Sequence, residues 1–309
     1  MKDVWSQVKI KGRAPKPEPE VQTPSEPQPP AQIADAGWRC PVCREPLTSD
    51  EYSFRCSNRH SFDVAKEGYI NLLLANKKNS AEPGDNKAML QGRRAFLERD
   101  FYQPLADKLA ELISKTFPDN TALNILDAGC GEGYYMGRVS TQLAGSHHFI
   151  GTDISRDAMR MAAKRYPSMQ FAVASSYDLP LADNSVDVLL RVFAPVPEAE
   201  VVRVLKPGGL YLWAHPGEQH LFALRELIYD QPQLHTVADD QPSDVRLVQQ
   251  PTENVSYPLV LPDSEAVKGL LAMTPYYWTA SKEKQQACEV LPELSLEADF
   301  RVSVLRKAG

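Results

Sequence analysis

The 309-residue sequence has few cysteines, no long apolar run and no excess of positive charge. Five cysteines are too few for a disulfide scaffold in a chain of this length, which argues against a disulfide-rich secreted fold. The chain has no run of about 18 apolar residues and no basic segment before an apolar one, so neither a membrane span nor a secretory signal is expected. We therefore expect a cytoplasmic protein without membrane association. The hydrophobic content of 43% suffices for one large domain or two of ordinary size.

The formal net charge of −6 is unevenly distributed along the chain. Residues 1–37 carry five cationic and five acidic side chains, and residues 38–108 carry twelve and ten. The remaining 17 cationic and 25 acidic side chains make residues 109–309 acidic. Contacts with nucleic-acid phosphates are therefore expected from the N-terminal part, although the same charges could form an ordinary solvated face. The cationic residues that cluster there include Lys77, Lys78, Lys87, Arg93, Arg94 and Arg99.

Composition divides the chain into four segments. Residues 1–37 are rich in Pro, Glu and Gln and have little to bury, which is typical of a disordered extension. Residues 38–75 hold a cysteine cluster on two short hairpin-like pieces, and residues 76–120 have the pattern of a helical connector, with Pro104 at a helix start. In residues 121–309 strands and helices alternate, which predicts an α/β fold with a doubly wound sheet.

The stretch LNILDAGCGEGYYMG, residues 123–137, has the pattern of an apolar strand, a glycine-rich turn and a helix. This arrangement brings free backbone N–H groups and the positive end of a helix to one point, which suits a nucleotide-like ligand. Gly129, Gly131 and Gly133 form G-x-G-x-G, and Tyr134 stands where the dinucleotide fingerprint has its third glycine. The pattern therefore disfavours NAD without excluding it. A tight turn that binds no ligand is the other interpretation.

Two acids accompany this glycine turn. Asp127 ends the strand before it, and Asp153 ends the next apolar run, HHFIGTDI, at the tip of the following strand. At that place the Asp153 carboxylate could accept hydrogen bonds from both hydroxyls of a ribose. The glycine turn and Asp153 thus form one constellation for a nucleotide-like cofactor.

The order of strands and helices and the turn LKPGG resemble the class I S-adenosylmethionine-dependent methyltransferases. The segment RVSVLR near the C-terminus is expected to be a closing strand, in antiparallel pairing. This resemblance implies that the glycine turn passes under the methionine part of S-adenosyl-L-methionine and that Asp153 binds its ribose. It also places Ser175 or Ser176 near the adenine. Ser175 stands where the family usually has an Asp, so an adenine contact at this position departs from the common pattern.

Cys40, Cys43, Cys56 and His60 have the spacing C-x2-C-x12-C-x3-H. Two ligands from a Cys-Pro-x-Cys knuckle and two from a second turn can surround one zinc ion tetrahedrally. Because all four ligands come from the protein, no position is left for water, and a structural zinc is expected. Removing this zinc should unfold the module instead of stopping a chemical step.

A longer series of motifs in one order resembles a single bacterial family, the 23S ribosomal RNA guanine-N1-methyltransferases, also called the RlmA or RrmA family. The likeness covers about residues 38–305 and leaves residues 1–37 outside it. It rests on the zinc knuckle and on the stretches FDVAKEGYINLL, PGDNKAMLQGRRAFLERDFYQPL, LDAGCGEGYY, AAKRYP, VASS, RVFAP, VLKPGG and MTPYYW.

This resemblance implies methyl transfer from S-adenosyl-L-methionine to N1 of a guanine in a hairpin of 23S ribosomal RNA. It further implies homodimers whose zinc modules line an RNA-binding cleft. It assigns the zinc ligands to the four residues of the knuckle pattern. Contacts with the cofactor fall on Tyr102, Tyr135, Met136 and His220; for Tyr102 and His220, ordinary packing is the other interpretation.

The sequence does not identify the group that removes the N1 proton. The Asn/Asp-Pro-Pro-aromatic motif of many base-modifying methyltransferases is absent from RVFAPVP. Phe193 and the cluster Tyr276, Tyr277 and Trp278 are candidates to stack on an extruded base, or else belong to the apolar core. Two other functions stay open: methylation of a small molecule or protein, and zinc-dependent RNA binding without catalysis.

Overall fold

The computed structural model describes residues 37–50, 52–75, 84, 87–119, 121–274, 276 and 280–309. Apart from Gly37, the extension expected at residues 1–37 lies outside this described part, so its expected disorder stays a prediction. None of the helices in the described part is long and apolar enough to span a membrane. Four residues singled out by the sequence also lie outside it: Lys77, Lys78, Tyr277 and Trp278.

Five parallel strands form the centre of the main sheet, in the spatial order β9-β8-β5-β6-β7. Successive residues of β5 face opposite sides of the sheet: Ile125 packs in one apolar cluster and Leu126 in another. Burial on both faces is typical of parallel strands covered by helices. The strands are β5 (Asn124–Ala128), β6 (His148–Asp153), β7 (Gln170–Val173), β8 (Val186–Val192) and β9 (Leu205–Pro216).

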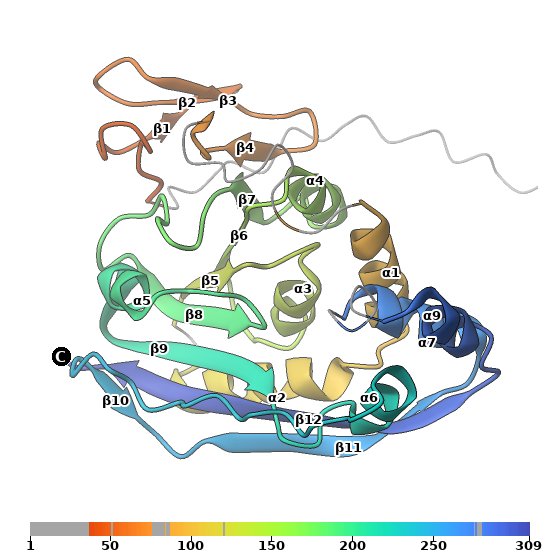
Figure 1. Cartoon of the computed structure of the whole chain (residues 1–309). Helices are drawn as coiled ribbons and strands as arrows, with labels where there is room; N and C mark the ends of the chain where they lie inside the picture. The colour runs from red at the N-terminus through yellow and green to blue at the C-terminus, as the bar shows by residue number, and fades with distance from the viewer. Residues whose placement is uncertain are drawn as a thin grey trace, which may run out of the picture.

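The sheet continues on the β9 side with a long antiparallel strand, β12 (Leu294–Lys307), which pairs with β9. Two further strands, β10 (Leu247–Gln249) and β11 (Glu253–Leu261), pair antiparallel with β12 and complete this edge, at the bottom of Figure 1. The expected doubly wound α/β sheet and its closing antiparallel strand are thus confirmed.

Helices join the parallel strands and cover both faces of the sheet (Figure 1). α3 (Tyr134–Ser140) follows β5, α4 (Arg156–Arg165) follows β6, and α5 (Glu198–Val204) follows β8. Ser155 begins α4, since its hydroxyl accepts a hydrogen bond from the backbone N–H of Ala158 at 3.3 Å. The C-terminal helices are α6 (Phe222–Ile228), α7 (Ser264–Ala272) and α9 (Lys282–Glu289).

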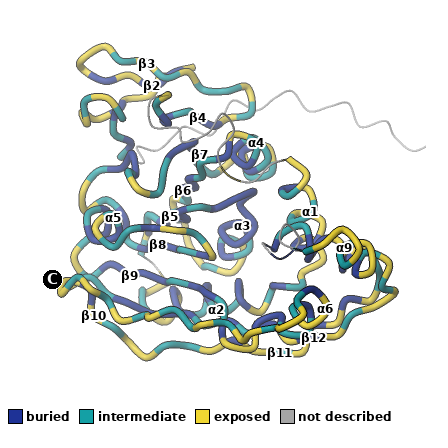
Figure 2. The backbone as a smooth tube through the Cα atoms, viewed as in Figure 1, coloured by how far each residue is buried: buried dark blue, intermediate teal, exposed yellow. Residues whose placement is uncertain are grey.

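The connector before β5 contains two helices, α1 (Lys87–Leu97) and α2 (Gln103–Thr116). Pro104 lies in the first turn of α2, as the sequence predicted. α2 buries one face, with Leu105 and Leu109 fully buried in the cluster that also holds Ile125. Figure 2 shows that the central strands and α3 are buried, whereas exposed residues lie along the outer helices and the β10–β11 edge.

The turn expected at LKPGG lies inside a strand. α5 ends at Val204 and β9 begins at Leu205, but the pairing with β8 moves from Val186–Leu205 to Val188–Leu210. The intervening residues leave the ladder as an irregular excursion, in which Gly208 has a φ of +75°.

The cysteine-containing segment forms a small antiparallel sheet above the main one, at the top of Figure 1. It consists of β1 (Thr48–Ser49), β2 (Ser53–Arg55) and β3 (Ser61–Asp63). The next strand, β4 (Tyr69–Asn71), pairs in parallel with β7 and so forms an edge of the main sheet.

Apolar residues of the cysteine-containing segment share one core with the main sheet. Trp38, Leu47 and Phe54 belong to the same buried cluster as Leu126 and Leu189. The indole Nε1 of Trp38 also donates a hydrogen bond to the side-chain oxygen of Gln170 at 3.0 Å. The segment is therefore packed onto the main sheet and not attached by a free linker.

Candidate active site and zinc centre

The glycine turn is fixed to the end of the neighbouring strand by backbone hydrogen bonds. The N–H groups of Gly129 and Cys130 both donate to the carbonyl of Thr152, at 2.8 and 3.0 Å. The N–H of Gly131 donates to Oδ2 of Asp153 at 3.0 Å, and the N–H of Ser155 donates to Oδ1 at 2.8 Å. Hydrogen bonds thus join the turn and Asp153, which the sequence assigns to one constellation.

Glycine is required at Gly129 for two reasons. Its φ of +81° lies in the left-handed region, and a Cβ there would lie 2.4 Å from the Cβ of Ala194. Ala194 belongs to the loop after β8, so the missing side chain lets that loop pass close to the turn. Gly129 and Ala194 both line a cavity.

The cavity measures about 760 Å³ and extends from the glycine turn to the segment after α7. Its first part, the cofactor half, lies around the turn and the ends of β5, β6 and β7. Residues of the sequence-predicted set that line the cavity are Tyr102, Asp127, Gly129, Gly131, Tyr135, Asp153, Ser175 and His220. Tyr102 and His220 thus line the cavity as well as packing in the interior.

Met136 differs from the rest of the predicted set. Its side chain is fully buried in a cluster with Leu90 and Met159, and it is not among the residues that line the cavity. Consecutive residues of a helix point about 100° apart, so when Tyr135 faces the cavity, Met136 faces the neighbouring helices. Of these two neighbours, only Tyr135 lines the cavity.

Asp127 is the most unusual group in the cofactor half. It is 1% exposed, and among the described residues neither carboxylate oxygen has a hydrogen-bond partner. Burial raises the pKa of Asp127 to about 8, and the nearby Asp153 and Glu132 add to this effect. A buried, unpartnered acid on a cavity wall fits a ligand that brings hydrogen-bond donors or a positive charge.

Glu132, inside the glycine turn, repeats this feature. It lines the cavity at 2% exposure, both of its carboxylate oxygens lack a partner in the described part of the chain, and burial raises its pKa. S-adenosyl-L-methionine carries an ammonium group and a sulfonium. The two buried acids, the glycine turn and Asp153 therefore fit this cofactor. Glu132 was not singled out from the sequence, where an acid next to glycines has no distinctive signal.

The second part of the cavity, here called the acceptor half, is lined by aromatic and imidazole side chains. Phe193 follows β8 with a φ of +55°, a strained conformation for a bulky residue, and remains 43% exposed. Its ring lies nearly parallel to that of His220, with centroids 6.2 Å apart and an angle of 24°. Its N–H donates to the carbonyl of Ala214.

Arg191 stabilises the strained loop that holds Phe193. Its guanidinium lies over the ring of Trp213 at 4.2 Å, and its Nε donates a hydrogen bond to the carbonyl of Ala194. The loop is therefore held on both sides of Phe193. Strain retained in this way is typical of functional sites.

His220 is a neutral hydrogen-bond donor. Burial, with a contribution from His235, lowers its pKa to about 3. Its Nδ1 accepts the backbone N–H of Asp299 at 3.3 Å, so the single ring proton is assigned to Nε2. The other members of the acceptor half include Met273, Thr274, His235 and Tyr276.

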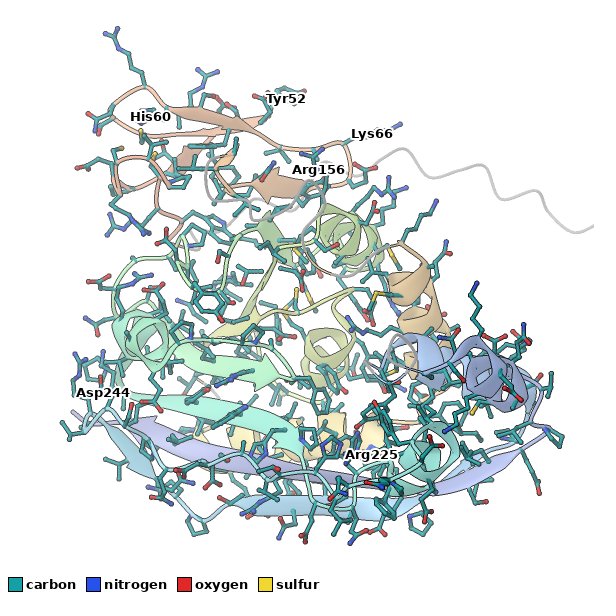
Figure 3. All side chains as sticks on the ribbon, in the orientation of Figure 1. Tyr52, His60, Lys66, Arg156, Arg225 and Asp244 are labelled. Carbon is teal, nitrogen blue, oxygen red and sulfur yellow. The ribbon has the colours of Figure 1, made fainter. Side chains whose placement is uncertain are left out.

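The four predicted metal ligands converge in the small sheet, where Figure 3 labels His60. The four donor atoms of Cys40, Cys43, Cys56 and His60 lie within 4.8 Å of one another. Nδ1 of His60 lies 3.6, 3.4 and 3.3 Å from the three sulfur atoms in that order, and the sulfurs of Cys43 and Cys56 are 3.7 Å apart.

The four separations of 3.3–3.7 Å are close to the edges of a zinc tetrahedron. Zinc–sulfur bonds of about 2.3 Å and zinc–nitrogen bonds of about 2.0 Å give edges of about 3.5–3.8 Å. Two similar turns present the ligands: the carbonyl of Cys40 accepts the N–H of Arg44, and that of Cys56 accepts the N–H of Arg59. Both arginines have positive φ. The site is therefore a closed Cys3His site for a structural zinc, and none of its ligands lines the cavity.

Comparison with known proteins identifies the same two parts. Residues 38–81 match the family model described as RlmA, N-terminal, a zinc ribbon, and residues 125–209 match that of a methyltransferase domain.

Named relatives resemble a larger part of the chain. A putative 23S rRNA (guanine-N(1)-)-methyltransferase, YxjB of Bacillus subtilis, is 31% identical over 280 residues, which are 86% of this chain and 96% of the relative. The 23S rRNA (guanine(748)-N(1))-methyltransferase of Streptomyces fradiae is 37% identical over 187 residues, 60% of this chain and 65% of that enzyme. A putative 23S rRNA (guanine-N(1)-)-methyltransferase of Micromonospora griseorubida is 34% identical over 203 residues, 60% of this chain and 68% of its own length.

Proposed function

The chain belongs to the 23S rRNA (guanine-N1)-methyltransferase family, and on this basis we propose that it transfers a methyl group from S-adenosyl-L-methionine to N1 of a guanine in a hairpin of 23S ribosomal RNA. The observation that carries the proposal is the single cavity that joins the glycine turn and Asp153 to a half lined by aromatic and imidazole groups. A small-molecule or protein acceptor is not favoured, because the three relatives described above are named as 23S rRNA methyltransferases or putative ones.

The cofactor half would supply partners for several polar parts of S-adenosyl-L-methionine. The carboxylate of Asp153, which accepts backbone N–H groups of Gly131 and Ser155, would accept the ribose hydroxyls. Asp127 would hold the ammonium group, the glycine turn would lie beneath the methionine chain, and Ser175 would lie beside the adenine. When bound, the cofactor supplies an activated methyl group, so the protein chiefly positions the acceptor and excludes water.

The remaining predicted cofactor contacts differ in whether their side chains line the cavity. Tyr102, Tyr135 and His220 line the cavity and stay candidates for direct contact. Met136 would act by packing behind Tyr135, because its side chain lies in the core.

The acceptor half is suited to a flipped base. Phe193 would stack on the target guanine, since its ring is exposed at the cavity and its backbone is fixed on both sides. Stacking on an aromatic ring stabilises an unstacked base by roughly 1–3 kcal/mol. The Nε2–H of His220 is a donor of the kind that would suit the guanine O6.

The zinc module would present the RNA. Its exposed cations include Arg55, Arg59 and Lys66, and Arg156 at the start of α4 is also exposed; Figure 3 labels the last two beside the small sheet. Two cations of the expected N-terminal cluster form ion pairs within the protein: Arg94 pairs with Glu98, and Arg99 pairs through both its terminal nitrogens with Asp263.

We further propose a cytoplasmic homodimer, in which two zinc modules would line one RNA cleft.

The experiment that tests the function is transfer of labelled methyl from S-adenosyl-L-methionine to large-subunit RNA that lacks the modification. The modified base is mapped by reverse transcription, which stops at a guanine methylated on its Watson–Crick edge. Asp153→Asn should abolish transfer by weakening cofactor binding, whereas Asp183→Asn, an exposed acid outside the cavity, should not. Clear cofactor binding without label in the RNA would refute the proposed acceptor.

A further inference from the structure

The chain between β7 and β8 connects the cavity with the zinc centre. Its first residues, Ser175, Ser176 and Tyr177, line the cavity. Residues 178–182, which follow them, contact the cysteine-containing segment beside the small sheet (Figure 1). We call residues 175–182 the bridging loop.

Backbone pairing joins the bridging loop to the residues just before the first zinc ligand. The N–H of Arg39 donates to the carbonyl of Pro180 at 2.9 Å. Trp38 pairs with Leu181 as an antiparallel bridge. Because Arg39 directly precedes Cys40, the path of the bridging loop follows the path of the metal-binding segment.

Arg44 adds a side-chain contact from the first zinc-binding turn. It directly follows the ligand Cys43, and its N–H donates to the carbonyl of Cys40 at 2.8 Å. Its guanidinium forms an ion pair with Asp178 and donates to the carbonyl of Leu179 at 3.5 Å. A residue whose backbone belongs to the metal-binding turn thus contacts the bridging loop with its side chain.

Asp178 is separated from the cavity wall by a single turn. Its N–H donates to the carbonyl of Ser175 at 3.1 Å, and the hydroxyl of Ser175 accepts the N–H of Tyr177 at 3.2 Å. These hydrogen bonds close a turn over residues 175–178. A displacement of Asp178 is therefore passed on to Ser175 and Tyr177 at the cavity.

α5 holds the other end of the bridging loop independently of the zinc site. Oε2 of Glu200 accepts the N–H of Leu179 at 2.7 Å. Arg203 donates to the carbonyls of Leu179 and Leu181 at 2.8 and 2.7 Å. The loop therefore has support that does not depend on Arg44, and variants at Arg44 should keep their fold.

The second zinc-binding turn offers an internal comparison. The N–H of Arg59 donates to the carbonyl of Cys56 at 3.0 Å, and its φ of +66° is close to the +62° of Arg44. Arg59 is exposed, and within the described residues no hydrogen bond or ion pair joins its side chain to the bridging loop. The two arginines thus share a backbone conformation beside the metal and differ in the contact with the loop.

We propose that Arg44 is a positioning residue that couples the zinc site to cofactor binding, by holding the bridging loop in the conformation that receives the adenine of S-adenosyl-L-methionine. This inference rests on the proposed function, which puts the adenine beside Ser175. It gives the zinc module a role besides the presentation of RNA. Because such a coupling is reciprocal, the cofactor must raise the affinity for zinc by the same factor by which zinc raises the affinity for the cofactor.

The test measures cofactor affinity in the absence of RNA, by isothermal titration of S-adenosyl-L-methionine into the zinc-loaded protein. Arg44→Gln should weaken binding roughly threefold to tenfold, since a half-exposed ion pair and a hydrogen bond are lost. Arg59→Gln, the matched control, should stay within about twofold of the wild type. Arg44→Lys should restore part of the affinity, because it keeps the charge beside Asp178. Metal analysis should find zinc retained in all three variants.

A second ligand locates the effect along the cofactor. Methylthioadenosine keeps the adenine and the ribose but lacks the amino-acid part. Because the bridging loop is assigned to the adenine, Arg44→Gln should lose the same factor of affinity for methylthioadenosine as for S-adenosyl-L-methionine. In assays on RNA, the KM for the cofactor should rise in this variant while kcat is kept.

Reciprocity gives a further readout in the wild type. Zinc affinity, measured by competition with a chelator, should rise roughly threefold to tenfold when S-adenosyl-L-methionine saturates the cavity. This rise should be smaller in Arg44→Gln than in the wild type and unchanged in Arg59→Gln.

The outcomes separate this inference from the proposed function. Wild-type cofactor affinity in Arg44→Gln would overturn the coupling and leave guanine methylation intact. An equal loss in Arg59→Gln would assign the effect to positive charge alone, and a loss confined to S-adenosyl-L-methionine would place it at the amino-acid end; either result would overturn the role of the loop. If the wild type methylates no guanine at N1, the proposed acceptor fails, while the binding measurements still decide the coupling.

Discussion

Replacing Asp127 with Asn should stabilise the cofactor-free protein and weaken cofactor binding. The carboxyl has a pKa of 3.8 in an ordinary environment and about 8 in the folded protein, where burial disfavours its charge. Between these two values the folded state holds one proton more than the unfolded state. The free energy of unfolding therefore falls as the pH rises through this interval.

The magnitude follows from the same two values. One proton per molecule corresponds to about 1.4 kcal/mol per pH unit, so the upper bound of the cost at pH 8 is about 6 kcal/mol. Water entry and local rearrangement reduce this cost. We expect Asp127→Asn to raise the free energy of unfolding by roughly 2 kcal/mol at pH 8, or several degrees in Tm, and by almost nothing near pH 4.

Denaturant unfolding at several pH values, with Asp183→Asn as the exposed-acid control, measures this gain. Isothermal titration should show S-adenosyl-L-methionine affinity reduced roughly 10- to 100-fold in Asp127→Asn, because a charge-assisted hydrogen bond contributes about 1.5–3 kcal/mol. A stability difference that does not change with pH would refute the buried-acid argument. Unchanged cofactor affinity would remove Asp127 from the binding site.

Three further changes test other parts of the molecule. Gly129→Ala should lower the free energy of unfolding by roughly 2–3 kcal/mol and abolish cofactor binding. The control is Gly68→Ala, since Gly68 also has a positive φ but has open space around it. This control should lower the free energy of unfolding by only about 1 kcal/mol, measured by thermal unfolding. Cys43→Ser should lose zinc, measured by metal analysis, and leave the small sheet open to proteolysis; zinc-free protein of unchanged stability would contradict a structural role. Phe193→Ala should weaken affinity for the target RNA by roughly tenfold, measured by filter binding, with cofactor affinity unchanged; equal RNA affinity would exclude stacking on Phe193.

Local patterns made part of this structure predictable. The apolar runs, the glycines at alternate positions and Asp153 each act within one strand–turn–helix unit, so sequence spacing alone places them together. The zinc ligands are similar, since a tetrahedral site imposes short and characteristic spacings. The resemblance to a family supplied Tyr102 and His220, for which no local pattern exists.

Other features depend on the tertiary fold and carry little local signal. β4 has only three residues, and its pairing with β7 across about 100 positions could not be inferred from its composition. The irregular segment inside β9 is defined by how β9 pairs with β8, and the LKPGG motif carries no information about that pairing register. Met136 and Tyr135 are adjacent in sequence, but the direction of α3 decides which of them reaches the cavity.

The acceptor half shows most clearly why function could be read only in part. His235 lies in an irregular segment after α6, and Tyr276 follows α7, so neither periodicity nor spacing connects them. They meet because α6 and the C-terminal strands fold over the same end of the sheet as the glycine turn (Figure 1). The methyl donor binds to a turn and an acid that lie close together in the sequence, so a short motif can encode its binding site. The acceptor base needs groups that converge from several directions, and these are encoded only by the packing of the whole domain.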